Sequence, residues 1–333
     1  MDIERMFEDG ARQGLFTDFD VCVRGPYEAS FKGGSHVSTG ARFFDIASIT
    51  KALTHLLLLR LFAEEVISPD DKLTRFLAVP NSGDRRLWHF MSYLAKEYAF
   101  YLDYDKLRKG EVGSLRDTIL AQGFGEWTRK FGYDNYSSVF LGVVLEKLFG
   151  ANLEEVFHSE LCCGVEPQTL FFHPTRRRMD ASLFVPTTSV LGTRGVAFDL
   201  VTSAHSAECL SIAGVFSDAS TVVSIFHRTL EQIIRSGFYS IASRNYLEGV
   251  DDTAQKPWGL GFDIPVTERN LGPTVGPMIF SGYTGCRIFF SEKPRLTMCI
   301  LTNRVFCGNT VESRERFSDF SWNVIREALH RAR

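Results

Sequence analysis

Apolar and polar positions follow two periods along this chain, and the change of period divides it into three parts. A period of two, typical of β-strands, occurs near both ends, and a period of 3.6, typical of helices, dominates the middle. Strands are expected at 18–23, 27–32, 257–264, 285–291 and 296–303, and helices at 2–14, 45–65, 138–149, 219–235 and 312–333. The first two strands, with Gly25-Pro26 between them, predict a hairpin on the edge of a sheet.

This order of elements predicts an α+β fold with one antiparallel sheet built from both ends of the chain. Helices at the N- and C-termini are expected to flank the sheet, and a mostly helical region is inserted between its strands. We expect residues 1–67 and 256–333 to form the sheet domain and residues 68–255 the inserted helical domain. The two domains would share one cleft, which is a common place for an active site.

The helix expected over 45–65 is apolar on nearly all sides after Lys51, so we expect it to be buried in the middle of the molecule. Its first turn carries Ser48 and Lys51. Residues three apart share a helix face, so the hydroxyl and the amine should point the same way. A serine hydroxyl becomes a strong nucleophile when a neighbouring base takes its proton. A neutral amine is needed for that step, and burial or a nearby positive charge would favour one.

Two plainer interpretations of these residues stand beside that one. Ser48 as a helix start and Lys51 as a surface residue would be preferred if the pair stood alone, because a pattern fixed at two positions arises by chance in a chain of this length. His55, one turn further along, offers a serine–histidine alternative. No serine here lies in a Gly-x-Ser-x-Gly turn, so we expect His55 to be a core residue.

Two further polar clusters follow, and with Ser48-Ile49-Thr50-Lys51 they form an ordered set. Tyr133-Asp134-Asn135 precedes the helix expected over 138–149, and Tyr283-Thr284-Gly285 leads into the strand expected over 285–291. The order Ser-x-x-Lys, Tyr-x-Asn, x-Thr-Gly resembles the class C β-lactamase and penicillin-recognising serine hydrolase family, over about residues 40 to 330. The resemblance implies a β-lactamase/transpeptidase-like fold.

The resemblance also implies roles for the residues of the first two motifs. Ser48 would be the nucleophile that forms an acyl-enzyme, and Lys51 and Tyr133 would act jointly as acid and base. Asn135 would hold Lys51 and a substrate carbonyl group. Read locally, Tyr133 and Asn135 could instead be turn residues ahead of a helix.

The third motif is implied to bind the substrate and to stabilise the oxyanion. The donors would be the backbone N–H groups of Ser48 and Cys286, and Gly285, after Thr284, would let the substrate lie close to the strand. Tyr283 stands where β-lactamases have lysine and many peptidases have histidine. A neutral tyrosine disfavours substrates that carry a carboxylate, although its hydroxyl can donate a hydrogen bond. Tyr283 as a packed strand aromatic is the plain alternative.

These motifs favour a serine hydrolase acting on a small ester, amide or peptide substrate. A true β-lactamase or D,D-carboxypeptidase is the alternative, and a relative that kept the fold but only binds or supports other molecules is a further one. The net charge of −3 argues against a nucleic-acid partner. The single basic run, 176–178, is expected to be a solvated loop. The sequence leaves the oligomeric state open.

Cysteine usage and the N-terminal sequence restrict cofactors and location. Seven cysteines without regular spacing do not form a disulfide framework. The adjacent Cys162 and Cys163 suit a tetrahedral metal ion poorly, so we expect neither a metal nor a cofactor. The apolar run 56–62 is too short to span a membrane and contains Arg60. The charged N-terminus is not a signal peptide as it stands, so we expect a cytoplasmic protein, or a periplasmic one if a leader has been removed.

Overall fold

The structure is a computed structural model that describes residues 2–96, 98, 105–106, 109, 111, 113–166, 168–188, 193–251, 256–265 and 271–333. The helices are α1 (Ile3–Arg12), α2 (Ile49–Ala63), α3 (Leu87–Met91), α5 (Leu115–Gln122), α6 (Tyr136–Phe149), α7 (Leu153–Glu160), α8 (Leu200–Ala204), α9 (Ala219–Arg235), α10 (Tyr239–Ala242), α11 (Arg304–Cys307) and α12 (Val311–Arg331). The strands are β1 (Asp18–Arg24), β2 (Ala29–Gly34), β3 (Phe44–Asp45), β4 (Leu170–Phe172), β5 (Val215–Ser217), β6 (Met278–Gly282), β7 (Cys286–Ser291) and β8 (Leu296–Thr302).

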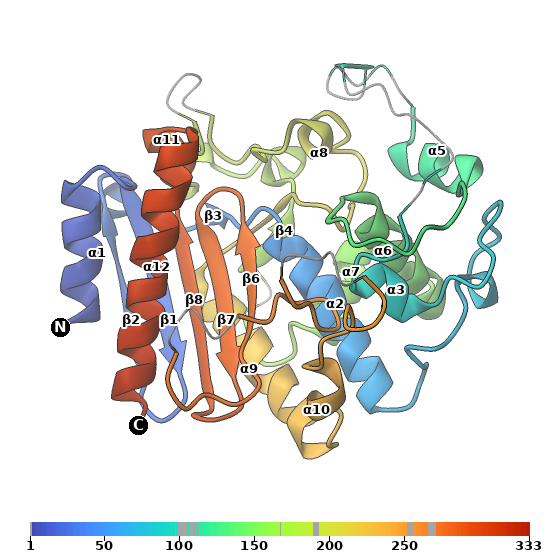
Figure 1. Ribbon diagram of the computed structural model, residues 1–333. Helices are drawn as coiled ribbons and strands as arrows, with labels where there is room; N and C mark the ends of the chain where they lie inside the picture. The colour runs from blue at the N-terminus through green and yellow to red at the C-terminus, as the bar shows by residue number, and fades with distance from the viewer. Residues whose placement is uncertain are drawn as a thin grey trace.

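The main sheet is antiparallel and is built from both ends of the chain, as the sequence predicts. Its strand order is β2-β1-β8-β7-β6, and β1 joins the two ends by pairing with β8, with Val21 opposite Ile300. Alternation along β1 points Val21 and Val23 into the core beneath α1 and α12, while Cys22 points into the core on the other side. Figure 1 shows α1 and α12 lying over one face of the sheet, and α9 packs against β1 and β8 on the other. The predicted α+β fold is therefore confirmed.

Helix α2 is buried along almost its whole length, which its apolar sequence predicts. Of its residues only Arg60 and Ala63 are not buried, because α2 packs against α6, α9 and the strands β6 and β7. It begins at Ile49, four residues later than expected. The carboxylate of Asp45 accepts hydrogen bonds from the N–H groups of Ala47 (2.8 Å) and Phe198 (2.7 Å), which closes a turn ahead of the helix. Ser48 is consequently the N-cap residue.

One expected strand is wrong and four short strands were not expected. Residues 257–264 form isolated bridges, between Trp258 and Asp263 and between Asp263 and Ile279. Gly261 turns the chain here at φ +83°, and a side chain at that position would collide with His55. β4 and β5 form a second sheet with β3, and β6 is the edge strand of the main sheet. The division into two domains stays a prediction.

Candidate functional site

Ser48 and Lys51 meet at the start of α2, as their spacing predicts. The Lys51 amine donates a hydrogen bond to Ser48 Oγ (3.1 Å) and another to the carbonyl oxygen of Ile212 (2.8 Å). Ser48 is partly exposed, whereas Lys51 is only 1% exposed. In the part of the chain that the structure describes, no carboxylate lies within ion-pair distance of Lys51. The amine is therefore held by neutral oxygens, and one of them belongs to the proposed nucleophile.

Tyr133 lies beside this pair. The Lys51 amine is 5.6 Å from the centre of the Tyr133 ring, and 47% of the Tyr133 residue surface is exposed. The ring packs against Tyr93 at 4.8 Å and Trp258 at 6.3 Å between centroids. Burial, followed by the proximity of Tyr133 and Asp134, raises the pKa of Tyr93 well above its usual value. Tyr93 thus stays a neutral phenol, and the exposed Tyr133 is the tyrosine that a substrate can reach.

Asp134 fixes the turn that presents Tyr133 and Asn135. Its buried carboxylate accepts hydrogen bonds from the backbone N–H (2.7 Å) and hydroxyl (2.9 Å) of Ser137 and from the hydroxyl of Tyr98 (2.9 Å). Burial raises the pKa of Asp134. Asn135 is the N-cap residue of α6, but its side chain does not cap the helix. Sequence reasoning passed over the capping role of Asp134, although an aspartate at the start of a helix is a capping signal.

A cavity of about 330 Å³ opens beside Ser48. Five of its eleven lining residues are aromatic, and the lining comes from the start of α2, from the segment before α6, from the turn that contains Trp258 and from the end of the edge strand β6. The lining residues are Ser48, Phe131, Tyr133, Lys256, Trp258, Asp263, Ile279, Phe280, Ser281, Gly282 and Tyr283. Two sequence-predicted catalytic residues, Ser48 and Tyr133, therefore share one cavity, with Lys51 directly behind.

The end of β6 lies against the turn that precedes Ser48. A side chain at Gly282 would come within 2.6 Å of the Ile46 carbonyl oxygen, so a glycine is needed for this close approach. Ser281 is the one exposed residue of β6. Tyr283 begins the turn from β6 to β7, is 43% exposed, and stacks on Phe198 with ring centres 5.6 Å apart. β6, which the sequence did not predict, is thus the strand that borders the cavity.

Thr284, Gly285 and Cys286 do not line the cavity. The Thr284 hydroxyl donates to the Asp45 carbonyl oxygen (2.9 Å), and the fully buried Cys286 thiol lies 3.6 Å from the same oxygen. Burial raises the pKa of Cys286 to about 12. Gly285 has φ +101°, and its carbonyl accepts from the Thr302 hydroxyl (2.7 Å). These contacts hold the β6–β7 turn against neighbouring segments. The positive φ of Gly285 is by itself a structural reason for a glycine at this position.

Two backbone N–H groups flank the cavity. Within the described residues, neither the N–H of Ser48 nor that of Tyr283 donates a hydrogen bond to another backbone group. Ser48 precedes the first turn of α2, where the helix dipole favours negative charge. Tyr283 follows Gly282, which contacts the turn containing Ile46 and Ala47. The two donors therefore come from chain segments that touch one another.

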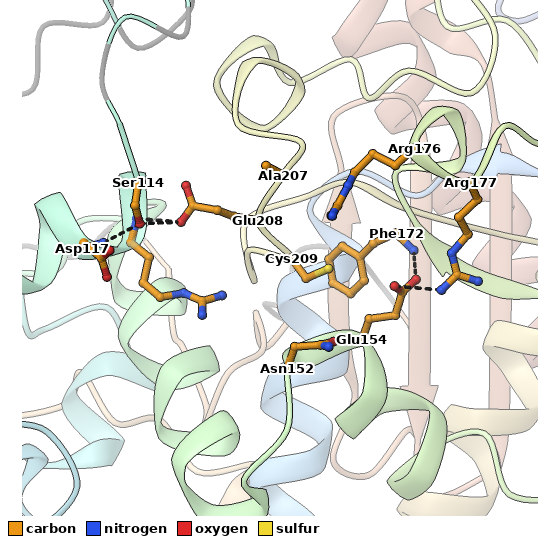
Figure 2. A pocket seen from close by; sticks show the side chains of 11 residues that line it. Ser114, Asp117, Asn152, Glu154, Phe172, Arg176, Arg177, Ala207, Glu208 and Cys209 are labelled. Carbon is orange, nitrogen blue, oxygen red and sulfur yellow. Dashed lines mark hydrogen bonds and ion pairs between the residues drawn. The ribbon is translucent and has the colours of Figure 1, made fainter.

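The described lining of a second, larger cavity of about 460 Å³ contains no residue of the three motifs (Figure 2). It is polar and is lined by Ser114, Arg116, Asp117, Asn152, Glu154, Phe172, Arg176, Arg177, Ala207, Glu208 and Cys209. Ser114 Oγ donates to the Glu208 carboxylate (3.1 Å) and accepts from the Asp117 N–H (3.1 Å), so it caps α5. Burial raises the pKa of Cys209 to about 11, which keeps the thiol protonated. We therefore place the candidate active site in the smaller cavity.

His55 and the basic run 176–178, which the sequence also singled out, are not among the residues that line the candidate active site. His55 is fully buried, its Nδ1 lies 2.9 Å from the Gly261 carbonyl oxygen, and burial lowers its pKa to about 4. In the basic run, Arg177 forms an ion pair with Glu154 (2.8 Å). Among the described residues, no group of three or more His, Cys, Asp or Glu side chains could hold a metal ion. No described helix is long and apolar enough to cross a membrane.

Comparisons with known proteins bear on the family and the fold. The sequence profile of the family described as Beta-lactamase matches residues 21–317. A search of curated proteins gave no match. Among solved structures, EstCE1, "a hydrolase with promiscuous acyltransferase activity", has a TM-score of 0.68 at 16% identity and covers 97% of each chain. The simvastatin synthase LovD9 mutant from Aspergillus terreus has a TM-score of 0.71 at 13% identity, covering 99% of this chain and 98% of its own. A β-lactamase/D-alanine carboxypeptidase from Pseudomonas syringae has a TM-score of 0.68 at 13% identity and covers 96% of each chain.

Proposed function

Since this chain belongs to the β-lactamase family, we propose that it is a serine hydrolase that cleaves an ester or amide through an acyl-enzyme on Ser48. The observation that carries the proposal is the hydrogen bond of 3.1 Å from the buried Lys51 amine to Ser48 Oγ, at the wall of an open cavity. A nucleophile in contact with a base, both fixed by the fold, is the arrangement that nucleophilic catalysis requires.

The first half of the reaction forms the acyl-enzyme. The Lys51 amine, acting as the base, takes the proton of Ser48 Oγ as this oxygen attacks the substrate carbonyl carbon, and the carbonyl oxygen becomes an oxyanion. When the intermediate collapses, the bond to the leaving group breaks. The leaving group then receives a proton from Lys51, directly or through the hydroxyl of Tyr133. The 5.6 Å between the Lys51 amine and the Tyr133 ring centre supports this shared role.

In the second half, water or another acceptor attacks the acyl group and releases Ser48. Lys51 and Tyr133 remove the proton from the acceptor as it attacks, and they return it to Ser48 Oγ as the ester bond to Ser48 breaks. The side chain of Asn135 is proposed to orient Lys51 and the substrate carbonyl. An acceptor other than water would give acyl transfer, and the structural neighbour EstCE1 is a hydrolase with that second activity.

For the oxyanion, the geometry supports the N–H groups of Ser48 and Tyr283. Both border the cavity and neither has a backbone acceptor within the described residues. The resemblance implied Cys286 as the second donor; Cys286 is fully buried and is not among the residues that line the cavity. Preorganised donors of this kind are typically among the largest contributions to catalysis in acyl transfer.

The cavity lining supports an ester or amide over a β-lactam. The third motif supplies no cation, since the resemblance places Tyr283 where lysine or histidine is usual, and the β6 residues that line the cavity, 279–282, are uncharged. A true β-lactamase or D,D-carboxypeptidase is therefore the second candidate, and a non-catalytic relative is the third.

Competition between p-nitrophenyl esters and a chromogenic cephalosporin tests these candidates. The proposal predicts turnover of the ester by the wild type, loss of that turnover in Ser48→Ala, and much slower cephalosporin cleavage. Faster cephalosporin cleavage would favour the β-lactamase alternative. If esters, β-lactams and D-amino-acid peptides all show neither turnover nor acylation, the chain is a binding or structural relative.

A further inference from the structure

Two charged side chains line the active-site cavity, among the residues that the structure describes, and they are paired with each other. Lys256 and Asp263 both belong to the lining, and the Lys256 amine forms an ion pair with the Asp263 carboxylate. The Lys256 amine also lies over the Trp258 ring, 5.0 Å from its centre. Lys51 is behind Ser48 and is not part of the lining. The described wall that meets a substrate is therefore neutral as a whole.

The backbone holds Asp263 firmly at the edge of β6. Its N–H donates to the Ile279 carbonyl oxygen (3.1 Å), and the Ile279 N–H donates back to the Asp263 carbonyl oxygen (3.0 Å). The Asp263 side chain is 26% exposed and that of Lys256 is 45% exposed. The carboxylate is thus the fixed partner, and the lysine is the longer and more exposed one. Removing Asp263 would leave a cation over the cavity wall.

We propose that the Lys256–Asp263 ion pair makes this cavity selective for uncharged, apolar acyl groups. The proposal rests on the function proposed above, and it names the substrate class. Five aromatic side chains and Ile279 form most of the wall, and burying a carboxylate against such a surface without a partner is costly. The Asp263 carboxylate is paired with Lys256, the cation that would otherwise pair with a substrate carboxylate. Asp263 also repels that substrate carboxylate.

A matched pair of substrates measures this selectivity. The acyl chains of 4-nitrophenyl butyrate and 4-nitrophenyl hydrogen succinate have the same number of carbons, and a carboxylate replaces the terminal methyl group in the second. We expect the wild type to have a kcat/KM for butyrate that is roughly a hundredfold higher or more, because the one cation of the described lining is already paired with Asp263.

Two variants change the charge of the cavity in opposite directions. Asp263→Asn frees Lys256 and is expected to raise the ratio of kcat/KM for the succinate ester to that for the butyrate ester about tenfold. Lys256→Met frees Asp263 instead and is expected to lower the succinate value further. Asp84→Asn is the matched control, because it breaks the exposed Lys72–Asp84 ion pair outside the cavity lining. This control should leave the ratio of the two substrates unchanged.

The outcomes separate this inference from the proposed function. If neither ester acylates Ser48, the proposed function itself fails. If butyrate acylates Ser48 but the wild type accepts the succinate ester equally well, the inference is wrong and the proposed function stands. The inference is also wrong if the substrate ratio stays the same in both folded variants, as judged by circular dichroism.

Discussion

Replacing Tyr133 by phenylalanine removes only the hydroxyl group that we assign to proton transfer. The phenylalanine ring keeps the contacts with Tyr93 at 4.8 Å and Trp258 at 6.3 Å. Since 47% of residue 133 is exposed, loss of the hydroxyl should change the free energy of unfolding by no more than about 0.5 kcal/mol. If the hydroxyl transfers protons in the transition state, kcat/KM should fall about a hundredfold or more, which corresponds to roughly 2.7 kcal/mol.

The assay compares kcat/KM for a p-nitrophenyl ester with urea unfolding of the same preparation. Tyr27→Phe is a control, because the half-buried Tyr27 donates its hydroxyl to the Ala328 carbonyl oxygen (3.3 Å) and packs against the core beneath α1 and α12, outside the cavity lining. It should lose about 1 kcal/mol of stability at most and keep its activity. A Tyr133→Phe enzyme within threefold of the wild type would refute the assignment. A large loss of stability would refute our reading of the packing.

Two further predictions concern the edge strand and the response to pH. Gly282→Ala would bring a methyl group within 2.6 Å of the Ile46 carbonyl oxygen and push β6 away from Ser48, so the rate of acylation should fall at least about tenfold with circular dichroism unchanged; an unchanged acylation rate would contradict this. Burial lowers the pKa of His55 and His173 to about 4 and of His89 to about 3, and it raises the pKa of Asp20 and Asp45 to about 6. As the pH falls from 7, the three histidines become protonated at a higher pH in the unfolded state than in the folded state, so they lower the free energy of unfolding. The two aspartates become protonated at a higher pH in the folded state, and they offset part of this loss. Urea unfolding should show a net loss of roughly 3 kcal/mol between pH 7 and pH 5, and equal or greater stability at pH 5 would contradict it.

Elements with a long, regular period could be predicted from the sequence, and so could the contact between Ser48 and Lys51. The helix expected at 219–235 is observed as α9 with the same ends. The Ser48–Lys51 contact is local, because it follows from three residues of helical rise. β6 was missed because it is only five residues long, and the period of two does not distinguish so short a run from its surroundings.

The third motif is a part of the site whose position the sequence alone could not predict. The run 281–286 contains two glycines, Gly282 and Gly285, and either could mark the end of a strand. Only the pairing of β6 with β7, in which Gly282 is opposite Cys286, shows that Thr284 and Gly285 lie in the turn. The pairing of Lys256 with Asp263 likewise depends on a turn that the sequence suggested was a strand. Such contacts depend on tertiary packing, which local patterns do not encode.

The most direct test of the central claim is intact-mass spectrometry after exposure to a small library of acyl donors, with wild type and Ser48→Ala compared. We predict one added acyl group per wild-type chain, located on the peptide that contains Ser48, and no added mass on the variant. Equal labelling of the two proteins would contradict the assignment of Ser48 as the nucleophile.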